Sequence, residues 1–352
     1  MARIMLFEVT AGIDSDGNTQ TFRFSSGSGY AGAGAPDYYE PRITTNLPIF
    51  SSKIAGDLQT LGKSDVSRGD VEIANPDGAF DFLFQYGYGR EGRILIGQDT
   101  DPYSDFVPVV TGIIQEAIAP DSTVIAFRFT DVQQELSLPF QPAKFLGTND
   151  GATIYAEGTP DDIMGQVKLR LLGWPQRGFS PVMVNSALLL FAFNFNRDGT
   201  RAPCLIINGV RDGGVALTFG SNYANLAALV ASSPASGHYN TCVAESLIML
   251  GTTPVYGITV DASAIYTKAG EVAQQVLLDA DVDESRIDVD SLAQFKADAN
   301  YTVGFYIDGS TTARDIVEAC ASAAGGFIFP DSNTNYKFAQ LKDPALQEPE
   351  LT

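Results

Sequence analysis

Two stretches of the chain alternate apolar and polar residues with period two: Thr19-Gln-Thr-Phe-Arg-Phe-Ser25 and Ala126-Phe-Arg-Phe-Thr130. In an extended strand, the second stretch places Phe127 and Phe129 on one face and Arg128 on the other. This alternation is typical of half-buried β-strands. The two stretches therefore predict a β-rich fold for the first 145 residues.

Further strand patterns surround these two stretches. The apolar run Arg3–Thr10 is separated from Thr19–Ser25 by Asp14-Ser-Asp-Gly-Asn18, which has the chemistry of a hairpin turn. A short helical piece is expected through Leu136, with Asp131 as its N-cap. The other expected strands of this region are Val71–Ala74, Arg93–Gly97, Val107–Ile118 and Thr123–Phe129.

Residues 146–260 predict a second β-rich region in which glycine turns separate the strands. One helix is expected there, capped by Ser221 or Asn222, because Tyr223, Leu226 and Leu229 recur at helical spacing before Pro234. The expected strands are Arg177–Pro181, Ala187–Phe195, Cys204–Val210 and Val215–Phe219.

Residues 261–352 predict a mixed region. Its expected helices run from Thr267 through Leu278, from a cap at Asp290 or Ser291, and over Ala313–Ala323 from a cap at Thr311 or Thr312. The expected strands are Tyr301–Ile307 and a hairpin of Phe327–Phe329 with Asn335–Leu341. The predicted fold class is thus α+β, mainly β. It has several barrel- or sandwich-like domains with a few short helices, divided as 1–145, 146–260 and 261–352.

The net charge of −20 over 352 residues argues against stable nucleic-acid binding, because phosphate contacts need clustered Lys and Arg. The charge serves solubility in any case, and it also suits a wall that DNA passes without adhering. The longest apolar stretch, 186–195, is about half a membrane span, and the N-terminal apolar run is too short for a signal peptide. We expect neither a membrane-spanning nor a targeting segment.

The chain has one histidine, His238, and three cysteines, Cys204, Cys242 and Cys320, in no paired motif. Most nucleophilic, proton-transfer and metal chemistry near neutral pH uses His and Cys. We therefore expect no catalytic residue, no metal and no cofactor, and buried free thiols in a protein assembled in a reducing cytoplasm. Carboxylates alone could still form a glycosidase site.

Two glycine-rich or acidic motifs have ordinary structural explanations. Gly87-Tyr-Gly-Arg-Glu-Gly92 matches G-x-G-x-x-G but precedes a strand instead of following one, so a turn is expected in place of a dinucleotide site. The segment Asp279–Asp290 resembles a calcium loop, yet Glu284 replaces the glycine and Asp290 replaces the bidentate glutamate. An acidic connector between two helices is the favoured interpretation of this segment.

Isolated candidates remain. His238 is expected in a loop, and Ser28 lies outside any strand-to-helix elbow. The pair Asp161–Asp162 is expected in an exposed turn or helix start. Trp174 fits a packing anchor and a contact residue between subunits equally well.

Several stretches, in order along the chain, resemble the tail-tip or baseplate hub proteins of tailed phages. They begin with Gly69–Leu83, which holds an "N-x-D-G-x-x-D" turn, and Gly92–Gly97. The later ones are Val110–Ile114, Phe127–Asp131, Leu138–Gln141, Asp212–Thr218, Asn222–Leu229, Leu250–Pro254, Thr312–Val317 and Gly325–Asp331 with Leu341–Pro344. The segment Gly173–Gly178 departs from the family's central glycine-proline pattern.

The resemblance implies domains related to tail-tube proteins and a homotrimer that continues the tail tube in the virion. It also implies contacts with the distal tail or tube protein, the tape measure and a central fibre, with DNA passing through the lumen during ejection. Two alternatives stay open. One is a tail-associated cell-wall glycosidase with facing carboxylates; the other is a receptor- or carbohydrate-binding module with exposed aromatics, for which Tyr38–Tyr39 and Tyr86–Tyr88 are candidates.

Overall fold

The computed structural model describes residues 2–14, 17–45, 51–54, 64–67, 70–129, 132–149, 157–331 and 334–341. The chain divides into two compact units. The N-terminal unit comprises Met1–Glu135 with Ser285–Asp288 and Ile328–Phe338. The C-terminal unit comprises Leu136–Glu284, Val289–Phe327 and Ala339–Thr352.

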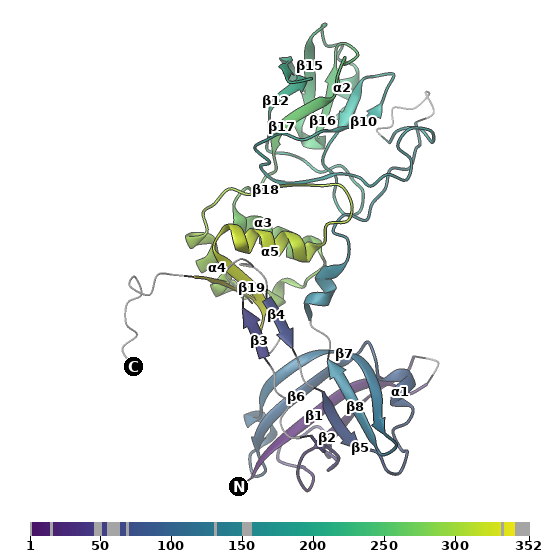
Figure 1. Ribbon diagram of the computed structural model, residues 1–352, viewed down its shortest axis with the longest axis vertical. Coiled ribbons are helices and arrows are strands. Elements are labelled where there is room, and N and C mark those ends of the chain that lie inside the picture. Colours follow the sequence, from purple (N-terminus) through teal and green to yellow (C-terminus); the bar gives the residue numbers. More distant parts are fainter. Residues whose placement is uncertain are drawn as a thin grey trace. The chain divides into compact units, whose positions relative to one another are not determined.

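A six-stranded antiparallel sheet of order β2-β1-β6-β7-β8-β5 forms the N-terminal unit and curls strongly (Figure 1). The segment 40–44 bridges its two edge strands: Ile43 N–H donates to Ser25 on β2, and Thr44 N–H donates to Glu72 on β5. The elements are β1 (Arg3–Gly12), β2 (Thr19–Ser25), β5 (Val71–Ala74), α1 (Leu83–Tyr86), β6 (Glu91–Gln98), β7 (Val107–Asp121) and β8 (Val124–Phe129), with a separate hairpin of β3 (Ser51–Ile54) and β4 (Ser64–Ser67) and short 3₁₀ turns at Tyr103–Asp105 and Val132–Ser137.

Strand β1 is buried on both faces over residues 4–7. Its odd-numbered residues, such as Phe7 and Val9, join a core that includes Phe127 on β8. Its even-numbered residues Ile4 and Leu6 pack on the opposite face, in the cluster that contains Tyr30, Tyr39, Leu95 and Phe106. The loop from 26 to 39 therefore covers one end of this outer face, and the polar residues further along β1 lie beside it.

The C-terminal unit contains a five-stranded sheet of order β10-β11-β16-β15-β14, a three-stranded sheet β13-β12-β17 and a pair β18-β9. Helix α3 packs against α5 and α4. The strands are β9 (Arg170–Gly173), β10 (Val182–Asn185), β11 (Leu190–Ala192), β12 (Ile206–Asp212), β13 (Val215–Ala216), β14 (Thr218–Asn222), β15 (His238–Cys242), β16 (Leu247–Leu250), β17 (Ile258–Ser263) and β18 (Gly304–Ile307), and the helices are α2 (Leu226–Val230), α3 (Ala269–Asp279), α4 (Val289–Asp298) and α5 (Ala313–Ala323), with 3₁₀ turns at Val243–Glu245 and Glu284–Arg286. The last hairpin is β19 (Gly326–Pro330) with β20 (Tyr336–Gln340).

The predicted fold class, mainly β with a few short helices, is confirmed. The strands expected before residue 130 are confirmed within a few residues, as are α3, α5 and the final hairpin. The expected capping of a helical piece by Asp131 lies outside the described residues, although that piece is present as the 3₁₀ turn Val132–Ser137. The division at 145 and 260 stays a prediction.

Three expectations for the middle region and α4 are wrong. Ser221 and Asn222, the expected caps, both lie in β14, where the Asn222 side chain accepts from Val243 N–H. Asn225 caps α2 instead by accepting from Ala228 N–H at 2.9 Å. The expected strand Arg177–Pro181 is reduced to one bridge at Phe179. Helix α4 begins at Val289, before the caps proposed at Asp290 and Ser291.

Candidate functional site

The single histidine and the lone tryptophan have local partners. His238 opens β15, not a loop, and its Nδ1 lies 3.0 Å from the carbonyl oxygen of Ser236. The indole N–H of Trp174 donates to Asp261 at 2.9 Å, while 36% of the residue stays exposed. Trp174 is therefore a partly covered surface residue. Its use as a packing anchor and its use as a contact residue between subunits both stay open.

The acidic candidates do not converge. Asp161 and Asp162 lie in an exposed turn, as expected, and Thr159 donates to Asp162 at 2.7 Å. In the segment 279–290, Asp279 pairs with Arg170 at 2.7 Å and Asp281 with Arg197 at 3.5 Å. Within the described residues, no group of three or more His, Cys, Asp or Glu side chains is arranged to hold a metal ion.

The cysteines are free and buried, as predicted. Burial raises the pKa of the Cys204 thiol to about 11 and that of Cys320 to about 12, and it also raises the pKa of Cys242. A thiol with a raised pKa has little nucleophilic thiolate at neutral pH. These residues therefore act as small apolar groups of the core.

The aromatic pairs differ from one another. Tyr39 is fully buried, whereas Tyr38 is half exposed and Tyr88 is 60% exposed. The glycine motif 87–92 forms the turn between α1 and β6, as predicted, with Gly87 closing the helix by donating to Leu83. Tyr38 and Tyr88 are thus available at the surface, and Tyr39 is a packing residue.

Motif residues that carry the family resemblance build turns and caps. In the turn Asn75–Asp81, the Asn75 side chain accepts from Phe80 N–H at 3.1 Å and donates to Asp81 at 2.7 Å, and Gly78 has φ +66°. The two terminal nitrogens of the Arg42 guanidinium donate to Asp77, at 3.0 and 2.8 Å, which lowers the pKa of that carboxyl to about 2. Each polar residue of the motif thus has a structural partner.

The later motifs behave in the same way. Thr312 and Asp315 form a capping box at the start of α5, with Asp315 N–H donating to Thr312 at 3.1 Å and Thr312 N–H to Asp315 at 3.0 Å. In the Leu138–Gln141 segment, the buried Gln141 amide donates to the carbonyl oxygens of Phe195 and Asn196. None of these residues is left with a free reactive group facing a cleft.

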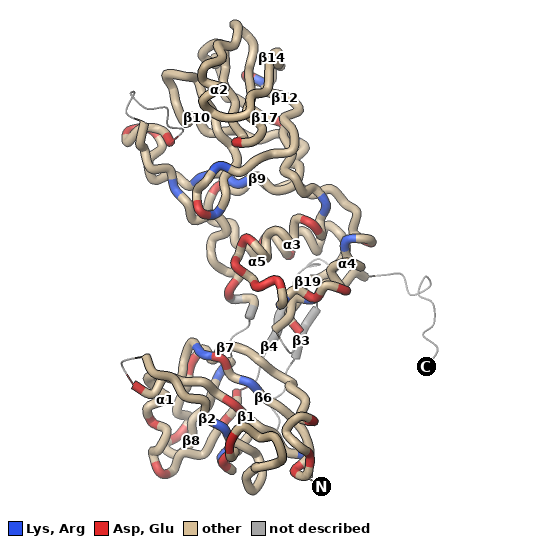
Figure 2. The backbone as a smooth tube through the Cα atoms, turned by 180° about the vertical axis from the view of Figure 1, so that it is seen from behind, with Lys and Arg blue, Asp and Glu red and all other residues tan. Residues whose placement is uncertain are grey.

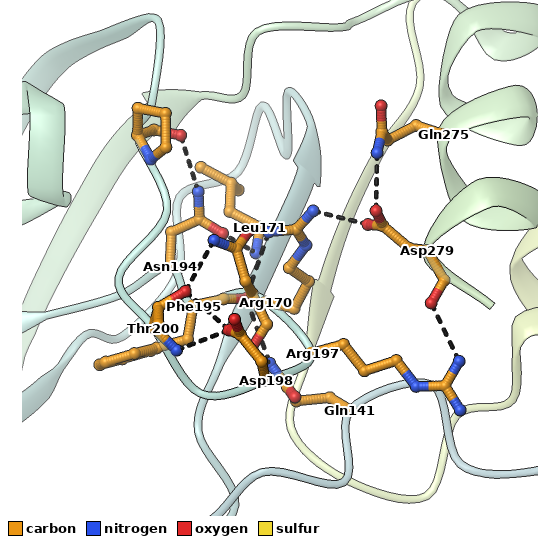
Figure 3. Close-up of polar contacts among 12 residues, drawn as sticks. Gln141, Arg170, Leu171, Asn194, Phe195, Arg197, Asp198, Thr200, Gln275 and Asp279 are labelled. Carbon is orange, nitrogen blue, oxygen red and sulfur yellow. Dashed lines mark hydrogen bonds and ion pairs between the residues drawn. The ribbon is translucent and has the colours of Figure 1, made fainter. Parts of the chain in front are cut away.

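The most extensive buried polar contact of the C-terminal unit centres on Arg170, a residue that sequence reasoning missed (Figure 3). Its guanidinium donates to Asp279 at 2.7 Å, to the Asn196 side chain at 2.9 Å and to the Phe195 carbonyl at 3.2 Å. Only 10% of the Arg170 side chain is exposed. A charge so buried is stable only when it is paired and hydrogen-bonded.

Arg170 thereby connects three parts of the C-terminal unit: strand β9, the loop at 195–196 and the end of α3. Asp279 is the last residue of α3, where a carboxylate is unfavourable beside the negative end of the helix dipole. The guanidinium offsets this cost, and Arg197 also donates to the Asp279 carbonyl at 2.9 Å. The adjoining cavity, about 180 Å³, is below the ~300 Å³ typical of ligand pockets. The contacts of Arg170 therefore hold β9, the loop at 195–196 and the end of α3 together.

Exposed apolar side chains gather at one end of the β13-β12-β17 sheet. Val215, Val255 and Tyr256 are each more than 70% exposed. Asp212 fixes this shape by accepting from the backbone N–H groups of Val255 and Tyr256, at 2.8 and 2.7 Å. Grouped exposed apolar residues are more typical of contact surfaces than of solvent-facing ones.

The charge is also unevenly distributed. Residues 136–260 contain seven Asp and Glu against seven Lys and Arg, so the whole net charge of −20 belongs to the residues before and after them. Figure 2 shows acidic positions clustered near α5 and few around α2, β12 and β17. This region, which has no net charge, is the one that carries the exposed apolar cluster.

No protein-family model matches the sequence, and no curated protein sequence matches it. Among solved structures, the chain is similar to one described as "Virion of native gene transfer agent (GTA) particle". The sequences are 14% identical, the match covers 79% of this chain and 83% of that chain, and the TM-score is 0.27. A TM-score this low does not assign a common fold.

No helix among the described residues combines the length and the apolar character needed to cross a membrane.

Proposed function

We propose that this chain is a structural protein of a phage-like virion, the hub of a tail tip or baseplate. Three copies close or continue the tail tube and join it to the distal tail protein, the tape measure and a central fibre for DNA ejection. No residue is catalytic in this proposal, and function lies in the contacts between subunits. An obligate assembly of this kind buries more than roughly 2,000 Å² at its interfaces.

One observation carries the proposal: polar motif residues that resemble the hub family, at 75–81, 141 and 312–315, form a turn, a buried amide contact and a helix cap. The Asn75–Asp81 turn and the Thr312–Asp315 capping box are the clearest cases, because the side chains of Asn75, Thr312 and Asp315 are hydrogen-bonded within their own motif.

Two surface features support assembly. All five residues of β14, an edge strand of the five-stranded sheet, are exposed, and edge strands can pair with another chain. The net charge suits a lumen that repels passing phosphate, since like charges keep DNA from adhering. A density map of the assembled tail that showed a neutral or basic lumen would contradict this part of the proposal.

Labelling of intact particles tests the location. A gold-labelled antibody against the chain is expected at the end of the tail distal to the capsid in electron micrographs. Label on the capsid, or particles that lack the chain altogether, would refute the proposed position. Particles from a deletion strain complemented with the chain provide the control for antibody specificity.

The N-terminal unit offers the glycosidase alternative a pair of carboxylates. Glu8 on β1 and Glu91 on β6 line the same hollow as diagonal neighbours on adjacent strands. A glycosidase needs two free carboxyl groups facing each other across a cleft, but Glu8 is already bound by Arg93, Tyr39 and Tyr103. We expect no clearing of a peptidoglycan suspension; clearing that is lost in Glu91→Gln would establish the enzyme instead.

A further inference from the structure

The N-terminal unit carries a polar hollow of about 400 Å³ on the outer face of its sheet. Its floor is formed by side chains of β2, β1 and β6, and Gly34, Pro36 and Tyr103 form its wall. The glycine-rich loop holds this wall in place, because Tyr30 is buried, pairs with Tyr39 and donates to the Asp101 carbonyl at 2.9 Å. The volume lies within the ~300–1,000 Å³ range of ligand pockets.

Strand register puts the floor residues in two rows on one face. Glu8 lies opposite Arg23 on one side and Arg93 on the other, and Thr10 lies opposite Thr21. Side chains two residues apart on a strand share a face, so both rows point into the same hollow. The floor is therefore an Arg-Glu-Arg row next to a row of hydroxyls.

The two arginines are not equivalent. Arg93 binds Glu8 at 3.1 Å and donates to the Tyr103 hydroxyl at 2.6 Å, and Tyr103 and Tyr39 donate to the same glutamate. Glu8 Oε1 thus accepts from two hydroxyls, and Oε2 faces the Arg93 guanidinium. Among the described residues, Arg23 has no carboxylate within ion-pair distance, and the contact of its guanidinium is a long one, 3.4 Å to the Thr21 carbonyl. The Nε atoms of Arg23 and Arg93 are both buried without a hydrogen-bond partner, so the two residues differ in the ion pair and not at Nε.

A half-buried, unpaired guanidinium is unusual in a chain with 42 acidic and 22 basic residues. The planar group presents paired N–H donors that match a carboxylate. The hydroxyl oxygens of Thr10 and Thr21 are hydrogen-bonded to each other at 3.0 Å. One hydroxyl hydrogen and several lone pairs of this pair stay available for a ligand. Glu91, an exposed residue of the lining, adds a carboxylate that can accept hydrogen bonds from ligand hydroxyl groups.

We propose that this hollow binds an acidic sugar, with the sugar carboxylate on Arg23 and sugar hydroxyls on Thr10, Thr21 and Glu91. The inference goes beyond the structural role proposed above and does not depend on it. A tail protein with such a hollow would make contact with carboxylate-bearing surface polysaccharide. Binding involves no bond cleavage, and Glu8 keeps its ion pair with Arg93.

Titration of the full chain with glucuronate, followed by NMR or calorimetry, tests the proposal. We expect saturable binding in the millimolar range, and at least a tenfold loss in Arg23→Gln, because a charge-assisted bidentate contact is removed. Arg3→Gln is the matched control: it makes the same change of charge at an exposed position of the same unit, outside the hollow. Its affinity should equal that of the unmodified chain.

Three further ligands show which chemical groups of glucuronate the hollow recognises. Glucose lacks the carboxylate, while glutarate and a short glutamate-containing peptide lack the sugar hydroxyls; all three are expected to bind at least tenfold more weakly than glucuronate. Glucuronate that fails to bind, or glucose that binds equally well, would overturn the proposal. Equal binding of glutarate or the peptide would assign the hollow to carboxylates of other origin and overturn the sugar.

A second variant, Thr21→Val, tests the proposal even if the Arg23→Gln chain fails to fold. Thr21→Val preserves shape and strand propensity but removes one hydroxyl. It should weaken glucuronate several-fold and leave the weak binding of glutarate unchanged. An equal effect on both ligands, or on neither, would contradict a role for the hydroxyl row.

Discussion

The Asp279→Ala substitution is expected to lower the free energy of unfolding of the C-terminal unit by about 3–5 kcal/mol. The change leaves the guanidinium of Arg170 buried, with 10% of that side chain exposed, and without its carboxylate at 2.7 Å. The Asn196 side chain and the Phe195 carbonyl remain as partners but carry no compensating charge. The measurement is chemical denaturation followed by a probe within this unit.

Two comparisons isolate the cause. Glu116→Ala, followed with a probe in the N-terminal unit to which it belongs, removes a partner of Arg128 at 2.6 Å, but both side chains of that pair are 44% exposed, so the expected cost is at most about 1 kcal/mol. Asp279→Asn keeps an acceptor for Arg170 and should cost less than alanine. If Asp279→Ala proved as mild as Glu116→Ala, the Arg170 network would not fasten β9 to α3.

The Phe7→Ala substitution is expected to destabilise the N-terminal unit by about 3–5 kcal/mol, the usual cost of deleting a buried phenylalanine. Phe7 is fully buried at the centre of the curled sheet. Its ring lies 5.2 Å from that of Phe127 and 6.1 Å from that of Phe129, so the substitution removes aromatic contacts as well as buried area. Thermal or denaturant unfolding of this unit measures the loss.

Phe84→Ala is the matched control for this prediction. Phe84 lies in the same unit, on α1, but is 38% exposed. Its removal leaves a smaller cavity, and a loss well below that of Phe7→Ala is expected. Equal losses in the two variants would show that the cluster around Phe7 is not the main core of this unit.

Local patterns predicted the elements whose stability is local. The alternation in Thr19–Ser25 matched β2 residue for residue, and the Thr312 cap with Asp315 three residues later matched the start of α5. The strands β15, β16 and β17 were not predicted. His238–Cys242 is mixed and Leu247–Leu250 is uniformly apolar, so neither shows the period-two signal, and their strand state depends on pairing with distant partners.

Sites built from long-range contacts were the least visible in the sequence. The Arg170–Asp279 pair joins residues 109 positions apart, and nothing near either residue indicates the other. Glu8 and Arg93 are similarly distant, and only strand register brings Arg23 beside them. The alternating polar residues of β1 and β2 did indicate a sheet face open to solvent. Pairing the two strands in register would have placed Glu8 beside Arg23 and Thr10 beside Thr21.

The mass of the native assembly formed by the purified chain tests the central proposal most directly. Native mass spectrometry or light scattering at micromolar concentration should give three times the 37.6 kDa of one chain. A trimer would agree with a closed, rotationally symmetric hub. A chain that stays at 37.6 kDa at every concentration, with or without its tail neighbours, would contradict it.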